Sequence, residues 1–305
     1  MDNTRGSIFM ILAMAAFAVE DMFIKAAAGF APLGVVLTLF GLGGMLIFIG
    51  LTWRRGEKVF NRAVLSRPIL IRAACEVVGR LCFALAIILT PLSSASAILQ
   101  ATPLVVVIGA ALLFGEHVGF KRWLAILIGF VGVLMIVRPG LDGFNPASIF
   151  AVICTLGFAG RDLATRAAPP VLSNMQLGVY GFFVLIPTGI VLQLFGDLFG
   201  FEALDVYTLI ADPNAAWLIL GSVVFGVIAY YSLTIAMRTG DVSVVTPFRY
   251  TRLLFALILG MLIFNEEPDA MTLLGGLLVV VSGAYTLLQS RRSKVVIDGP
   301  RLILR

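Results

Sequence analysis

Residues 7–25, SIFMILAMAAFAVEDMFIK, align without a gap on residues 148–166, SIFAVICTLGFAGRDLATR. Each stretch is mostly apolar, and about 20 such residues are needed for an α-helix to cross a bilayer. A cleaved N-terminal signal would not be repeated in the middle of the chain, so we expect the first span to be retained. The positions in register include Ser7 with Ser148, Phe17 with Phe158, Asp21 with Asp162, and Lys25 with Arg166.

The repeat continues beyond these two stretches. With an offset of 150 residues, a second set of positions falls in register, namely Ala86 with Ala236, Ser93 with Ser243, Phe114 with Phe264, and Glu116 with Glu266. The chain therefore divides into a first unit, residues 1–140, a second unit, residues 146–290, and a basic tail, residues 291–305.

Composition indicates a membrane protein rather than soluble domains. Of the 305 residues, 60% are hydrophobic and 13% are charged, and the mean hydropathy is +1.05. Soluble domains are about 25% charged. Ten stretches have the length and apolar character of a spanning helix, which predicts an all-α polytopic membrane protein with ten transmembrane helices. The stretches are residues 7–27, 33–53, 69–89, 94–114, 119–137, 146–166, 174–196, 215–237, 242–264 and 270–289.

Five spans in each unit force the second unit to insert upside down. Two inverted five-helix repeats are the architecture of many secondary transporters. Lys and Arg residues divide between the two faces as 16 to 2, which places both termini in the cytoplasm by the positive-inside rule. The same rule explains the pI of about 9.4, so we do not expect nucleic-acid binding.

The stretch 93–116, SSASAILQATPLVVVIGAALLFGE, and its weaker counterpart 243–267, SVVTPFRYTRLLFALILGMLIFNEE, resemble the EamA type of the drug/metabolite transporter superfamily. The resemblance covers residues 1–290. It implies a central cavity lined by spans 1, 3, 4, 6, 8 and 9, with spans 5 and 10 at the periphery, in the bacterial inner membrane. Members of this family export neutral and aromatic amino acids and other metabolites or drugs, or take up compounds such as S-adenosylmethionine, riboflavin or sugars.

Ionisable side chains within a span are candidates for function because their burial is costly. In span 3, Arg72, Glu76 and Arg80 follow at i, i+4 and i+8 and share a face that continues to Phe83. Arg72 lies near the end of the span, where a long side chain reaches the headgroups. Glu76 and Arg80 form either an internal ion pair or a site for a substrate's ammonium and carboxylate groups.

Span 9 carries Arg249, Tyr250 and Arg252 directly after Pro247. A proline removes a backbone donor and bends a helix, so Pro247, and Pro103 in span 4, are candidate hinges. The two arginines either bind an anionic group in the cavity or pair with acids of other spans.

Further candidate substrate contacts are polar or aromatic residues on otherwise apolar helices. The alternative for each is packing or hydrogen bonding between helices. They are Gln100 in span 4 and Tyr230, Tyr231 and Thr234 in span 8.

Two acid–base pairs at i, i+4 occupy corresponding positions of the repeat, Asp21 with Lys25 and Asp162 with Arg166. Each pair is either a capping ion pair or one gate on each side of the membrane. Glu20 adds a carboxylate beside the first pair. A coupling proton, if there is one, falls to Glu76 or Asp21.

Chemistry that needs a metal or a cofactor is not indicated. The chain has one histidine and three cysteines within apolar runs, and we expect no metal site and no cofactor. An intramembrane lipid-modifying enzyme would need clustered ligands or a nucleophile with its base, and neither pattern is present. The expected partners are the lipid bilayer, a small-molecule substrate and possible coupling protons.

Overall fold

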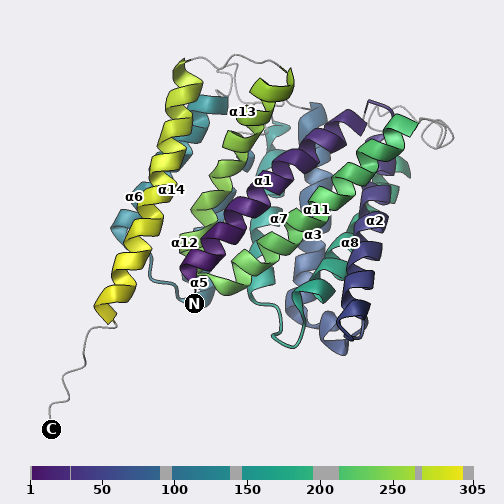
Figure 1. Cartoon of the computed structure of the whole chain (residues 1–305), viewed down its shortest axis with the longest axis horizontal. Coiled ribbons are helices and arrows are strands. Elements are labelled where there is room, and N and C mark those ends of the chain that lie inside the picture. Colours follow the sequence, from purple (N-terminus) through teal and green to yellow (C-terminus); the bar gives the residue numbers. More distant parts are fainter. Residues whose placement is uncertain are drawn as a thin grey trace, which may run out of the picture.

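The computed structural model describes residues 2–27, 29–89, 98–137, 146–194, 213–264 and 270–297, and within these ranges it contains helices and no strand. Figure 1 shows the helices as a bundle. The long elements are α1 (Asn3–Ala27), α2 (Leu33–Arg54), α3 (Arg67–Leu89), α5 (Thr102–Phe114), α6 (Phe120–Val137), α7 (Ser148–Arg166), α8 (Asn174–Leu194), α11 (Pro213–Thr239), α13 (Thr251–Phe264) and α14 (Ala270–Ile297). The short elements are η1 (Arg62–Leu65), α12 (Val242–Val245) and η2 (Thr246–Tyr250).

The chain is a multi-pass membrane protein. Six helical stretches in the described part are long and apolar enough to cross a bilayer: Asn3–Ile24, Leu33–Arg54, Ser148–Arg166, Asn174–Leu194, Ala216–Thr239 and Val242–Leu259. Shorter apolar helices cover Thr102–Phe114 and Ala270–Tyr285. Leu112, Leu194 and Leu262 are 80%, 74% and 75% exposed, which suits lipid and not water. Helix α3 is not among the six, and it carries four charged residues within its length.

Helices of the first half of the chain pack on helices of the second half. Extensive contacts join α1 to α11, α2 to α8, α3 to α7, and α6 to α14. Figure 1 shows α6 and α14 together at one edge of the bundle, beside α13. The α3–α7 contact is close because Gly157 faces Gly79: a Cβ atom built on Gly157 would lie 2.9 Å from the Gly79 Cα. This approach brings the charged residues of α3 and α7 together.

The stretch 242–264, expected as one span, is interrupted near its beginning. The α-helix ends at Val245, residues 246–250 form a 3₁₀ turn with Pro247 in its first turn, and the α-helix resumes at Thr251. A proline that lacks its N–H favours such a break. Pro103 lies instead in the first turn of α5, where a missing N–H costs little. Residues 94–97 of the predicted fourth span lie outside the described part.

Candidate functional site

A cluster of charged side chains lies where α3, α7 and η2 meet. We call it the central ion cluster, and it consists of Arg72, Glu76 and Arg80 of α3, Arg161 and Asp162 of α7, and Arg249 of η2. Arg72, Glu76, Arg161 and Asp162 are all at most 6% exposed. Charged side chains at such depth are retained only when they are paired, and they mark functional sites in membrane proteins.

Glu76 is shared by two arginines. Its Oε1 atom accepts a hydrogen bond from Arg80 Nε at 3.1 Å, and its Oε2 atom lies 3.2 Å from Arg161 Nη1. The first contact follows from the i, i+4 spacing, which places both side chains on one face of α3. The second contact joins α3 to α7.

Asp162 is shared in the same way. Its Oδ1 atom lies 2.9 Å from Arg161 Nη2, and its Oδ2 atom accepts a hydrogen bond from Arg249. Arg161 therefore bridges Glu76 and Asp162, and Asp162 extends the ion pairs from α7 to η2. The result is one connected network across three elements.

Arg72 lies buried at the edge of this network, 3% exposed, and does not extend to the headgroups as its position in the sequence suggested. Its Nε atom donates to the Thr165 hydroxyl at 2.9 Å, and its Nη2 atom donates to the Tyr230 hydroxyl. The described part shows no carboxylate in ion-pair contact with it. The central ion cluster thus contains four guanidinium groups and two carboxylates, so it carries a formal excess of two positive charges.

Aromatic rings cover several of these guanidinium groups. Phe158 lies 5.0 Å from Arg161 and 5.8 Å from Arg80, measured from ring centroid to Cζ. The ring at the corresponding position of the repeat, Phe17, lies 5.2 Å from Arg252. Such cation–π contacts stabilise a guanidinium away from water.

Asp21 of α1 pairs with Arg252 of α13. Arg252 Nε donates to Asp21 Oδ2 at 2.8 Å, which joins α13 to α1. The side chain of Lys25, its expected partner, lies outside the described part. In the second copy, Asp162 belongs to the central ion cluster, and Arg166 donates to the main-chain oxygens of Met237 and Arg238.

The remaining candidates lie apart from the charged groups or at their edge. Tyr250 is fully buried with Val133 and Val279, between η2, α6 and α14. Thr234 donates to the main-chain oxygen of Tyr230 in its own helix. Tyr231 packs against the apolar core around α2 and α8, while Phe83 and Gln100 are half-buried.

The end of the bundle that holds the N terminus is closed by hydrogen bonds. Asn3 Nδ2 donates to Asp241 Oδ2 at 2.8 Å, and the carboxylate of Glu116 accepts from the main-chain N–H groups of Val242 (3.0 Å) and Ser243 (2.9 Å). Figure 1 shows the N terminus, α5 and α12 at this end. We call this set of contacts the N-terminal latch. It ties the turn between α11 and α12 to α1 and to the loop after α5.

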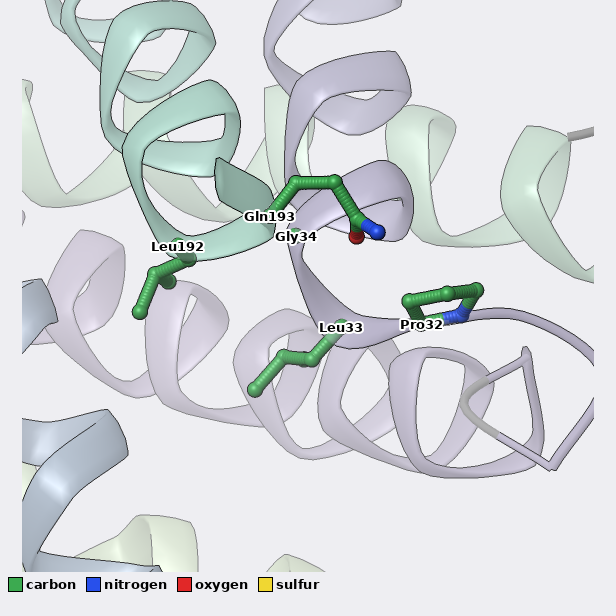
Figure 2. A pocket seen from close by; sticks show the side chains of 5 residues that line it. All are labelled: Pro32, Leu33, Gly34, Leu192 and Gln193. Carbon is green, nitrogen blue, oxygen red and sulfur yellow. The ribbon is translucent and has the colours of Figure 1, made fainter. Parts of the chain in front are cut away.

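Apart from the central ion cluster, the described part offers no metal centre, and a pocket between α2 and α8 contains no cluster of charged groups. No group of three or more His, Cys, Asp or Glu side chains could hold a metal ion within the described residues. This small pocket lies between the ends of α2 and α8 (Figure 2). It is lined by Pro32, Leu33, Gly34, Leu192 and Gln193, none of which is charged.

Sequence reasoning missed two important residues. Arg161 was counted with the charges of the cytoplasmic side, although it lies within the predicted span 146–166, and that position was the available signal. Glu20 was noted only as an extra acid, yet it is 2% exposed and its Oε2 atom has no hydrogen-bond partner. Thr165, which positions Arg72, had no signal beyond its place on α7.

Comparisons with known proteins agree with this architecture. The model of the EamA-like transporter family matches residues 4–138 and 145–288. A riboflavin transporter of Vibrio cholerae is 29% identical over 64% of this chain and 62% of its own length, which is less than two thirds. An S-adenosylmethionine uptake transporter of Rickettsia prowazekii is 23% identical over 76% of each chain. A pseudopaline exporter of Pseudomonas aeruginosa is 27% identical over 91% of this chain and 94% of its own.

The overall fold also has a counterpart among solved structures. One crystal structure superimposes with a TM-score of 0.79 and 17% sequence identity, and the match covers 95% of this chain and 98% of the other. At this identity the likeness concerns the fold alone.

Proposed function

The chain belongs to the EamA-like transporter family, and from that premise we propose that it moves a small metabolite with a carboxylate and an ammonium group across the bacterial inner membrane by alternating access. The observation that carries the proposal is the central ion cluster. Its guanidinium forks suit a carboxylate, and Glu76 and Asp162 suit an ammonium group. Neutral and aromatic amino acids, moved outward, are the leading substrates.

In the mechanism that we propose, the carboxylates of Glu76 and Asp162 form ion pairs with arginines of the central ion cluster while no substrate is bound. An incoming substrate carboxylate takes their place on Arg161 or Arg249, or binds Arg72, and the substrate's ammonium group pairs with a released acid. Exchange of one ion pair for another avoids leaving a charge unpaired in the membrane interior. Phe158 and Tyr230 supply apolar surface for the substrate's side chain.

The topology that we propose is ten spans in two inverted repeats, residues 1–140 and 146–290, with both termini in the cytoplasm. The helix contacts support it. If α1 corresponds to α7 and α3 to α11, the α1–α11 and α3–α7 contacts are equivalent by symmetry, and α2–α8 and α6–α14 join corresponding helices. In this orientation, the N-terminal latch is a closed cytoplasmic gate, and Pro103 and Pro247 are its hinges.

S-adenosylmethionine is the second candidate substrate. Relatives from Rickettsia carry that name, and the compound has the same amino and carboxylate groups as an amino acid. A cationic drug fits less well, because the central ion cluster already has an excess of positive charge. A riboflavin-like metabolite would use the aromatic surface rather than the ion pairs.

Flux in proteoliposomes tests the proposal. Vesicles with the purified protein are preloaded with unlabelled amino acids, and entry of labelled phenylalanine, methionine, threonine and S-adenosylmethionine is followed. We expect saturable counterflow that is absent from empty vesicles. In Arg249→Met it should fall about tenfold or more, because losing a buried charge partner costs about 2 kcal/mol or more.

The matched control is Arg62→Met, which changes an exposed arginine on η1 outside the spans. It should transport like the unaltered protein. If the folded protein moves none of the four compounds, the proposed substrate class is wrong. If Arg249→Met transports normally, the central ion cluster does not bind the substrate.

A further inference from the structure

Glu20 of α1 is a buried acid without a partner. The residue is 2% exposed, its Oε2 atom has no hydrogen-bond partner, and no ion pair to it occurs among the described residues. On the neighbouring helix α11, Gly226 lies close to it: a Cβ atom built on Gly226 would lie 3.5 Å from Glu20 Cδ and 2.4 Å from the Phe40 ring. An ionised carboxylate in such a place is costly.

The charged groups around Glu20 are engaged elsewhere. Those that act on it are Asp21 on its own helix, Arg252 on α13, and Arg80 and Glu76 on α3. Arg252 donates to Asp21 through Nε and Nη2, and Arg80 donates to Glu76. The two guanidinium groups near Glu20, those of Arg252 and Arg80, therefore donate hydrogen bonds to other carboxylates.

We infer that Glu20 is a proton-binding site of the carrier, neutral while Arg252 is bound to Asp21 and ionised when Arg252 turns to Glu20. The two acids are adjacent on α1, so a small change at the α1–α13 contact transfers Arg252 from one to the other. The proton comes from water beside Asp21, whose side chain is 50% exposed, binds at Oε2 of Glu20, and returns to water when Arg252 replaces it.

This assignment differs from the one that sequence reasoning favoured. Glu76 and Asp21 both accept hydrogen bonds from arginines. Glu20 has no such partner. A coupling role for the proton rests on the proposed transport function, whereas the binding of the proton does not.

Infrared difference spectroscopy on the full-length protein in lipid vesicles tests proton binding without any substrate. Exposed carboxyl groups are ionised above about pH 6, so a protonated carboxyl band that remains above that pH reports a buried acid. We expect such a band, shifted by deuteration, in the unaltered protein, its decrease in Asp21→Asn, where Arg252 is released to pair with Glu20, and its loss in Glu20→Gln. Absence of the band from the unaltered protein, or its persistence in Glu20→Gln, would overturn the inference.

Flux measurements then test coupling. With whichever labelled compound shows counterflow, a pH gradient should alter net flux in the unaltered protein, and Glu20→Gln should remove that dependence. Dependence that survives in Glu20→Gln would contradict coupling at this residue. If no compound moves, the substrate proposal fails, and the infrared band still decides whether Glu20 holds a proton.

Discussion

Helices α1 and α7 carry corresponding sequences but make different use of them. Both place an aspartate at the same position of the repeat, Asp21 in α1 and Asp162 in α7, and the preceding residue is Glu20 in one and Arg161 in the other. In α7 the arginine and the aspartate join a buried network. In α1 the aspartate lies half-exposed and the glutamate is buried without a partner. The acid at position 20 and the base at position 161 thus accompany different pairing of the two aspartates.

The largest expected effect comes from making the same substitution in the two copies. Asp162→Asn should lower the free energy of unfolding by about 3 kcal/mol, because Arg161 and Arg249 lose the buried carboxylate between them. Asp21→Asn should cost about 0.5 kcal/mol, since its pair with Arg252 is partly exposed. Equilibrium unfolding in mixed micelles measures both values. Equal losses would show that the two copies do not differ as described.

The second prediction concerns the distance between α7 and α3. Gly157→Ala should cost about 2 kcal/mol, because the added Cβ would lie 2.9 Å from the Gly79 Cα and 3.0 Å from the Cys75 main-chain oxygen. The corresponding residue of α1 is already an alanine, Ala16. The same unfolding measurement serves here. Gly50→Ala is the control because nothing lies within 4 Å of its added Cβ, and a loss there as large as at Gly157 would contradict the packing argument.

The third comparison concerns the last turn of α7, where the expected loss is smaller than at Asp162 or Gly157. Thr165→Val removes the hydroxyl that accepts from Arg72, while α1 has Ile24 at the corresponding position. Loss of a hydrogen bond to a charged group predicts a decrease of about 1.5 kcal/mol in unfolding free energy. Thr188→Val is the matched control, since that buried hydroxyl bonds only to Val184 of its own helix. Similar losses in the two variants would mean that Arg72 gains nothing from Thr165.

The sequence predicts the helical, multi-pass membrane character because apolar runs of bilayer length have few alternative structures, and six described helical stretches are long and apolar enough to span. Periodicity also places Glu76 and Arg80 on one face of α3, where they form an ion pair. Family membership, expected from the resemblance, is confirmed by the match over most of the chain. These inferences depend on local spacing or on overall composition.

Partners from distant parts of the chain could not be predicted in this way. Asp21 and Arg252 are 231 positions apart, and no local spacing rule points from one to the other. Arg161 was assigned to the cytoplasmic side because charges near helix ends usually report topology. The 3₁₀ turn at Pro247 changes the direction of the residues that follow, so Tyr250 packs against α6 and α14 and away from Arg249's partners.

The internal pairing of Glu76 and Asp162 has a consequence for the return half of the transport cycle. In the mechanism that we propose, these carboxylates keep the central acids of the empty carrier paired, so it can reorient without a second metabolite as return cargo. Such a carrier would carry out net transport and would not be limited to exchange. Efflux into substrate-free buffer should then proceed at a rate comparable with exchange.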